Sequence, residues 1–417
     1  MKAIGLAVAG ALPWLIFRVV ADLHAAPAAL VAALSGLAIL SAAFILSWAA
    51  EAFQLDVSQA LALSLLSLIA VLPEYAVDVV FAWRAAADPT QAPYAVANMT
   101  GGNRLLIGLG WSAVVIVAWF RARRRSRGHP ELAADPAVRL TDEGTAIVLN
   151  PGQVVELAAL GAATVYSLLI PLKGGIGPLD TVVLVSLFAV YAWATARAPA
   201  EEPHLVGPAA LIGGLRKGTR RLVVAALFVF AAGVIFASAE PFAEGLVQSG
   251  ASLGVDEFLL VQWLAPLASE SPEFVVALLF AWRGLAGAGL RTLVASKVNQ
   301  WTLLIGTLGA AYSLALGAPA DLPLDARQTE ELFLTSAQSL FALVLIANFD
   351  LSVREAVFLL ATFLVQLVFP GTEVRLGFAV LYVVGAVALL VSSPARRRAL
   401  AGMSGQLRDA VRLGAPA

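Results

Sequence analysis

The residues best able to do chemistry in this sequence are two carboxylates that lie inside long apolar segments. Glu74 and Glu273 each follow a proline, in the closely matching stretches PEYAVDVVFAWR (73–84) and PEFVVALLFAWR (272–283). A carboxylate deep inside an apolar helix is costly, so its presence favours a functional role over a structural ion pair. Because carboxylate oxygens bind hard cations and protons, the pair indicates a site for one or the other.

Other polar side chains accompany the two glutamates. Asp78 lies one helical turn after Glu74, and Glu270 lies about one turn before Glu273, so each pair shares a helix face. Clustered carboxylates favour retention of a proton by at least one of them. A buried, hydrogen-bonded aspartate is the alternative for Asp78. The amides and hydroxyl that serve either as ion ligands or as helix-to-helix hydrogen-bonding groups are Asn98, Asn103, Ser296 and Asn299.

Two cations also fall inside apolar segments. Lys297 is either an internal counter-charge paired with Glu273 or Glu270, or a side chain that reaches back to the membrane interface. In the first case its ammonium takes the place of a coupling ion or alternates with it. Arg104, next to Asn103, is a second internal counter-charge, directed toward Glu74.

The composition indicates a membrane protein. Of the 417 residues, 60% are hydrophobic and 13% are charged, and the mean hydropathy is +0.86, whereas about a quarter of a soluble protein is charged. The chain has no cysteine, and its three histidines all fall in predicted loops. Disulfides, thiolate nucleophiles, helical zinc sites and intramembrane Ser-His proteases are therefore excluded, and we expect neither an enzyme nor a cofactor.

The apolar runs are long enough to cross a bilayer as helices. They predict about twelve spans, at 3–21, 26–50, 57–83, 93–120, 152–170, 177–197, 221–246, 256–282, 291–317, 330–348, 352–369 and 374–393. With the N-terminus inside, twenty Lys and Arg residues fall on the cytoplasmic side and five outside. We therefore expect a multi-pass protein of the inner (plasma) membrane with both termini cytoplasmic. The basic run at 121–127 is interpreted as a topology anchor, not a nucleic-acid site.

The matching Pro-Glu stretches belong to a longer internal repeat. Seven of their twelve positions are identical, and LLIGLG (105–110) matches LLIGTLG (303–309) downstream. Each repeat holds five spans, an odd number, so the second enters the membrane inverted, as in many transporters. The expected division is a peripheral first helix (1–25), repeat 1 (26–197) with a cytoplasmic loop (121–151), a cytoplasmic linker (198–220), repeat 2 (221–370), and a peripheral last helix with a basic tail (371–417).

Four helices are expected to be interrupted. Pro73 and Pro272 each remove a backbone donor beside a glutamate. ANMTGGNR (97–104) and ASKVNQW (295–301) are the expected breaks in the spans that follow. The fold class is therefore all-α and polytopic, with two inverted five-helix repeats and broken helices lining an oxygen-rich site near the midplane.

These paired motifs resemble the cation/Ca2+ exchanger superfamily, which includes sodium/calcium and proton/calcium exchangers. The counterparts of its G-T-S-x-P-E and G-N-x-x-G-S-N-x-x-N motifs are IAVLPE (69–74) with ANMTGGNRLL (97–106), and ASESPE (268–273) with ASKVNQWTLL (295–304). The resemblance implies that Glu74 and Glu273 are the carboxylates that coordinate the metal.

The sequence also departs from the family pattern. Ala70-Val71 replaces the hydroxyl pair in repeat 1, where Gly102 and Leu106 occupy the later ligand positions. In repeat 2, the resemblance adds Ser269, which is kept, Glu270 in place of the second hydroxyl, and Gln300 in a ligand position, whereas Leu304 supplies no ligand. Because most neutral ligands are lost, one ion site is more plausible than several.

The function expected from the residues and the resemblance is secondary antiport by alternating access. A metal cation, Ca2+ or Na+, is exchanged for protons at the midplane carboxylates, with lipid, inorganic cations and protons as the partners. Proton coupling is favoured over sodium coupling because hydroxyl ligands are lost while carboxylates and a lysine are gained. The alternative is a degenerate exchanger fold that moves another solute or serves as a membrane interaction protein.

Overall fold

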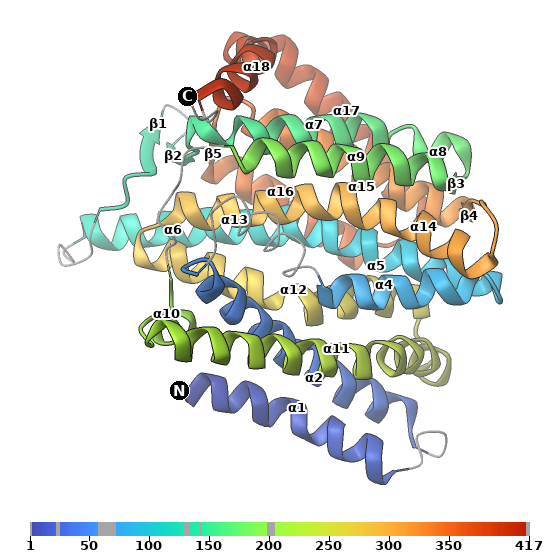
Figure 1. Cartoon of the computed structure of the whole chain (residues 1–417). Coiled ribbons are helices and arrows are strands. Elements are labelled where there is room, and N and C mark those ends of the chain that lie inside the picture. The colour runs from blue at the N-terminus through green and yellow to red at the C-terminus, as the bar shows by residue number, and fades with distance from the viewer. Residues whose placement is uncertain are drawn as a thin grey trace.

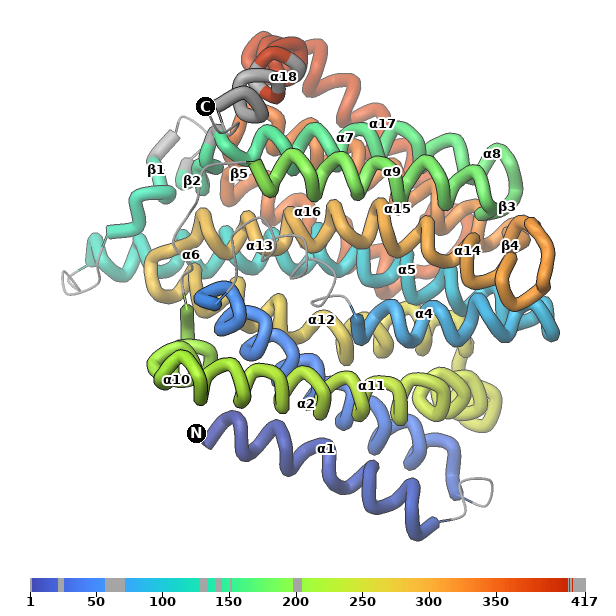
Figure 2. Tube along the Cα trace, in the orientation of Figure 1, coloured from blue at the N-terminus to red at the C-terminus, as the bar shows by residue number. Residues whose placement is uncertain are grey.

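The computed structural model describes residues 2–21, 26–56, 72–127, 134–141, 144–197 and 205–413 (Figures 1 and 2). The first half of the chain forms α1 (Lys2–Val20), α2 (Ala28–Phe53), α4 (Leu72–Ala85), η1 (Pro89–Gln91), α5 (Ala92–Leu105), η2 (Leu106–Trp111), α6 (Ser112–Ser126), η3 (Pro151–Gln153), α7 (Val154–Ser167), α8 (Ile170–Lys173) and α9 (Pro178–Thr195). The second half forms α10 (Pro208–Gly213), α11 (Lys217–Leu253), α12 (Glu257–Arg283), α13 (Ala286–Asn299), η4 (Gln300–Leu304), α14 (Ile305–Leu316), α15 (Ala326–Ile346), α16 (Val353–Val368), α17 (Thr372–Ser392) and α18 (Pro394–Leu413).

The chain is a polytopic α-helical membrane protein, as the sequence predicts. Within the described residues, nine helices are long and apolar enough to cross a membrane. Every predicted span overlaps a described helix, but 57–71 lies outside the described residues and α16 is only 16 residues long. The predicted number of twelve spans therefore stays a prediction.

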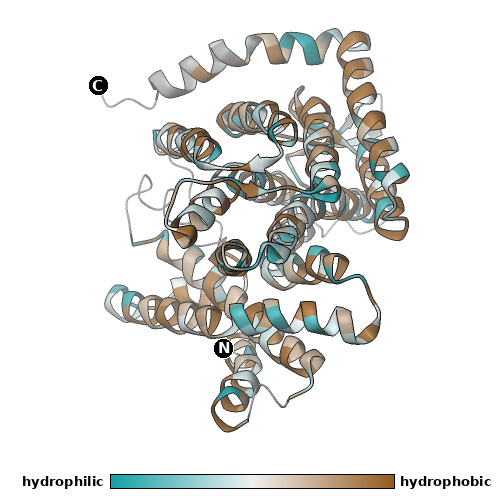
Figure 3. Cartoon of the chain, turned by 90° about the vertical axis from the view of Figure 1, so that its right-hand side faces the viewer, coloured by the Kyte–Doolittle hydropathy of each residue, from teal (hydrophilic) through white to brown (hydrophobic). Residues whose placement is uncertain are grey.

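The helices run roughly side by side in layers, and their outer surfaces are apolar. In Figure 1, α1, α2 and α11 lie together at one edge, while α15 and α17 pack against each other at the opposite side. Large apolar side chains such as Val19, Val229 and Val387 stay exposed on α1, α11 and α17. Figure 3 shows the same apolar colouring along most helices, which suits a surface that faces lipid.

Several helices begin and end at recognisable signals. Asp256 caps α12 by accepting a hydrogen bond from the Phe258 backbone N–H, and α12 ends at Gly284, which has a φ of 87°. Capping boxes formed by Asp325 with Gln328 and by Ser352 with Glu355 begin α15 and α16. These signals set where each of these helices begins or ends.

The helix interruptions lie later in the chain than predicted. Residues 97–104 lie within the regular helix α5, and the π-helical segment η2 follows it. In the second repeat, α13 continues through Asn299 before the π-helical segment η4 begins at Gln300. The expectation of a break at 97–104 is therefore wrong, and at 295–301 only the last two residues lie in the irregular segment. Each π-helix loosens the backbone by widening a turn rather than by ending the helix.

Pro272 also does not interrupt its helix, because α12 runs without a break from Glu257 to Arg283 and contains both Pro266 and Pro272. Membrane helices tolerate proline where neighbouring groups compensate for the missing hydrogen bond. Pro73 lies at the second described residue of α4, and the residues before it, 57–71, are outside the described part.

Two small antiparallel sheets tie the loops together, although the sequence predicted only loops there. The strands β1 (Val138–Thr141) and β2 (Gly144–Val148) form a hairpin within the predicted loop 121–151, and β2 pairs with β5 (Asp350–Ser352). At the other end of the helices, β3 (Gly175–Ile176) pairs with β4 (Leu322–Pro323) (Figure 1). The linker 198–220 likewise contains α10 and the beginning of α11, and α18 extends along the tail.

Candidate cation site

Two glutamates from opposite repeats meet at a glycine of α5. A methyl group added to Gly102 would lie 2.2 Å from Oε1 of Glu270 and 3.0 Å from Oε1 of Glu74. Gly101, its neighbour, lets α5 approach α12 closely, since a methyl there would lie 1.8 Å from the Gln262 carbonyl oxygen. The two glycines thus permit the close packing that brings the carboxylates together.

These carboxylates are buried and incompletely paired. Glu74 is 1% exposed, and neither of its oxygens accepts a hydrogen bond from a described residue. Glu270 accepts one from Nε2 of Gln300 at 3.1 Å, while its Oε2 has no described partner. Since buried charged groups require a compensating partner, this arrangement suits a bound cation or protons.

The sequence predicted Glu74 and Glu273 as the metal-coordinating pair, and the geometry brings Glu270 to Gly102. Glu273 is half-buried on the same helix, within electrostatic range of Glu270 and Glu74, and its Oε2 has no described partner. Residues three apart on a helix point in directions roughly 60° apart, and of the two it is Glu270 whose carboxylate lies beside Gly102 with that of Glu74. The candidate pair that converges is therefore Glu74 with Glu270.

Asp78 and Asn98 form a second buried pair beside the glutamates. Nδ2 of Asn98 donates to Oδ1 of Asp78 at 2.7 Å, which links α5 to α4. Oδ2 of Asp78 and Oδ1 of Asn98 have no described partner. Asp78 lies within electrostatic range of Glu74 and Glu270, so it is both a hydrogen-bonded aspartate and a neighbour of the site.

The neutral side chains predicted as ligands do not all point toward the two carboxylates. Ser269 donates to the carbonyls of Ala265 and Pro266, at 3.2 and 3.3 Å, and so bonds its own helix. Gln300 reaches Glu270 and keeps its Oε1 without a described partner. Asn299 is buried at the end of α13.

Lys297 is an interior cation. Its side chain is 0% exposed, which contradicts the interpretation that it reaches the membrane interface. Nζ donates to Oδ1 of Asn103 at 2.7 Å and lies 3.9 Å from the ring centroid of Trp301. Lys297 also interacts electrostatically with Glu270 and Glu74, although its direct partner is neither of the predicted carboxylates.

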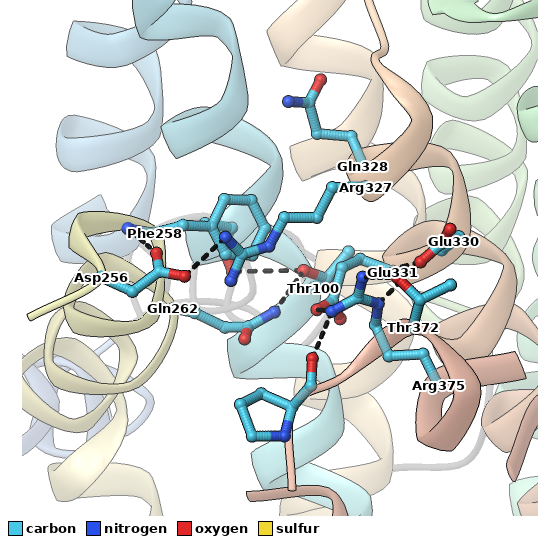
Figure 4. A network of polar contacts seen from close by, with 12 residues as sticks. Thr100, Asp256, Phe258, Gln262, Arg327, Gln328, Glu330, Glu331, Thr372 and Arg375 are labelled. Atoms are coloured by element: carbon cyan, nitrogen blue, oxygen red, sulfur yellow. Dashed lines mark hydrogen bonds and ion pairs between the residues drawn. The ribbon is translucent and has the colours of Figure 1, made fainter.

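Arg104 is not a counter-charge of Glu74, and this prediction is wrong. Its guanidinium lies 2.6 Å from Oε2 of Glu331 on α15 and 5.0 Å from the ring centroid of Trp263. Successive helical residues point about 100° apart, so Arg104 leaves α5 on a different side from Asn103. Figure 4 shows the surroundings of Glu331, where Arg375 binds Glu330 at 2.7 Å.

Glu331 is a buried charged residue that the sequence analysis missed, although a signal was present. QVVEL (153–157) matches QTEEL (328–332), which places Glu331 opposite Glu156 in the repeat. Glu156 lies 3.3 Å from Arg291 of α13. Each of these carboxylates therefore pairs with an arginine from the other repeat.

The donors near Gly102 are oxygens, as a hard cation requires. Within the described residues, no three His, Cys, Asp or Glu side chains cluster closely enough to enclose a metal. A cation held here would therefore combine the Glu74 and Glu270 carboxylates with amide oxygens and water.

Comparison with known proteins identifies the family of the chain. The model of the family described as sodium/calcium exchanger protein matches residues 27–196 and 223–371. The solved structure of the H+/Ca2+ exchanger CAX is 41% identical over 98% of both chains, with a TM-score of 0.89. No curated protein matches the chain.

Two more distant structures share the fold. Native YfkE is 14% identical over 91% of this chain and 100% of its own, with a TM-score of 0.60. The sodium-calcium exchanger NCX_Mj is 16% identical over 82% of this chain and 99% of its own, with a TM-score of 0.52. The resemblance identified in the sequence is thus confirmed, and the chain belongs to the sodium/calcium exchanger protein family.

Proposed function

We propose that this exchanger is a secondary-active antiporter that exchanges a metal cation for protons at the carboxylates around Gly102. The observation that carries the proposal is the convergence of Glu74 and Glu270, buried and without full pairing among the described residues. Two such carboxylates hold either a metal ion or protons, because each ligand removes the charge that the other needs. This competition couples the two fluxes when the site is exposed to one side of the membrane at a time.

Ca2+ is the metal that the oxygen donors and the similar proteins favour. Carboxylates, amide oxygens and water are the ligands that Ca2+ takes in proteins. The solved structure that is 41% identical to this chain is that of an H+/Ca2+ exchanger, and Na+ is the second candidate cation. We place the protein in the inner (plasma) membrane with both termini cytoplasmic, because the basic residues are distributed that way. We assign 26–197 and 221–370 to the two repeats because the matching Pro-Glu stretches lie within them.

The test is exchange by the full-length protein in proteoliposomes, with Ca2+ or Na+ on one side and an imposed pH gradient. We expect Ca2+-driven proton flux in the wild type and its loss in the Glu74→Gln, Glu270→Gln double variant. Glu240→Gln is the control, because the Glu240 side chain is 63% exposed and pairs with Arg84 at the surface. Wild-type exchange by the double variant would refute the proposed site.

A degenerate exchanger is the second candidate. Leu106 and Leu304 are fully buried at positions where the family resemblance leads one to expect polar ligands, and the described acidic residues do not enclose a metal by themselves. Absence of flux for Ca2+, Na+ and H+ in well-folded protein would favour this candidate over the antiporter.

A further inference from the structure

The buried ammonium of Lys297 is held by uncharged groups, which do not neutralise its positive charge. Its direct hydrogen-bond acceptor is the neutral amide of Asn103, and its other neighbour is the face of Trp301. A cation–π contact stabilises a cation without donating a full negative charge. The positive charge of Lys297 therefore remains free to act on other charged groups nearby.

The other internal cation, Arg104, is held by a negatively charged group instead. Arg104 lies 2.6 Å from the carboxylate of Glu331, which neutralises it locally. Of the two internal cations, Lys297 is the one that lies beside the site. Its acceptor Asn103 directly follows Gly102 on α5, and Gln300, one turn after Lys297, donates to Glu270 at 3.1 Å. The carboxylates of Glu270 and Glu74 face each other across Gly102 and lack full pairing among the described residues.

We infer that Lys297 is a resident cation of the ion site, a tethered positive charge that offsets one carboxylate and limits the site to one mobile metal ion. This inference rests on the proposed function. Lys297 is carried by α13 of repeat 2, and its anchor Asn103 belongs to α5 of repeat 1, so both repeats fix its position. The metal ion then binds against the repulsion of a fixed neighbour.

This repulsion has a measurable size. Coulomb's law between a unit charge and a divalent ion about 10 Å apart, at an effective dielectric constant of about 20, corresponds to a change in binding of roughly 100- to 1,000-fold. Replacing Lys297 by a neutral residue is therefore expected to tighten Ca2+ binding by that factor, and replacing it by arginine to leave the affinity within about threefold.

The experiment is calorimetric titration of Ca2+ into purified full-length wild type, Lys297→Gln, Lys297→Met and Lys297→Arg. Lys297→Met keeps an apolar side chain against Trp301. It serves as the neutral variant if Lys297→Gln does not fold, and folding is judged by size-exclusion chromatography. Tighter binding by the neutral variants, with one Ca2+ per wild-type chain, is the expected result. Unchanged or weaker binding by a folded neutral variant, or two or more Ca2+ per wild-type chain, would overturn the inference.

The proposed function fails by a different result. If the wild type neither binds nor transports Ca2+ or Na+, the antiporter proposal is wrong. If the wild type exchanges Ca2+ for protons while the neutral variants bind Ca2+ no more tightly, only the role of Lys297 is wrong.

Discussion

The Gly102→Ala substitution tests the geometry of the site most directly. Its methyl group would lie 2.2 Å from Oε1 of Glu270 and 3.0 Å from Oε1 of Glu74, so at least the first carboxylate has to move. Glu270 is a flexible side chain, so it yields by turning away and stretching its 3.1 Å hydrogen bond from Gln300. The fold tolerates this change, whereas a binding site made of both carboxylates does not.

The magnitudes separate stability from binding. Alanine gains about 1 kcal/mol over glycine within a helix, and an extra methyl in a packed site costs about 1–3 kcal/mol. The two effects nearly offset each other, so we expect Gly102→Ala to unfold within a few degrees of the wild type. A binding cost of about 1–3 kcal/mol weakens Ca2+ affinity roughly 5- to 150-fold, and proton-coupled flux falls with it.

The assay compares Ca2+ affinity, proteoliposome flux and thermal stability in detergent. The matched control is Gly233→Ala, a glycine of the membrane helix α11 where an added methyl meets nothing within 4 Å. We expect this control to keep wild-type affinity and flux. Wild-type affinity and flux in Gly102→Ala would show that Glu74 and Glu270 do not bind the cation together.

Three further substitutions test ion pairs away from the site. Glu331→Gln leaves Arg104 buried without its partner, so we expect a loss of about 3–5 kcal/mol of stability. Glu240→Gln, at the exposed pair with Arg84, should cost under about 1 kcal/mol, and equal melting temperatures for the two variants would contradict this reasoning. At the end of α2, the hydrogen bonds from Arg220 hold the pKa of Asp56 below its usual value. Asp56 therefore stabilises the fold above the pKa of an unfolded aspartate, about 3.9, and this contribution is lost as the pH falls through its lower folded value. The melting-temperature difference between wild type and Asp56→Asn should shrink between pH 7 and pH 3, and a constant difference would exclude this linkage.

Much of the fold was predictable from the sequence because lipid imposes simple rules. Apolar runs must be helices, and the duplicated Pro-Glu stretches aligned two halves before any contact was known. The same alignment placed Glu74 and Glu270 in the interior, since chemical type and depth are properties of the sequence, and it left an interior position for Lys297 as one of two alternatives. Their burial in the structure agrees with that reasoning.

What failed was the choice of partners. Arg104 and Asn103 are neighbours in the chain, but they leave α5 on different sides, and only tertiary packing decides that one meets Glu331 and the other Lys297. The π-helical segments also carry no composition signal comparable to Gly101-Gly102, because widening a turn depends on how neighbouring helices pack. Local propensity therefore located the interruptions a few residues too early.

The two small sheets repeat the same contact between the two halves of the chain. In β2–β5, the loop after α6 in the first half pairs with the loop after α15 in the second; in β3–β4, the loop after α14 in the second half pairs with the loop after α7–α8 in the first. Each half thus contributes both kinds of loop, one to each sheet. Identical subunits contribute in the same way across a two-fold dimer interface. The same reciprocal arrangement relates Glu156–Arg291 to Glu331–Arg104. What holds the halves together is thus a subunit interface enclosed within one polypeptide.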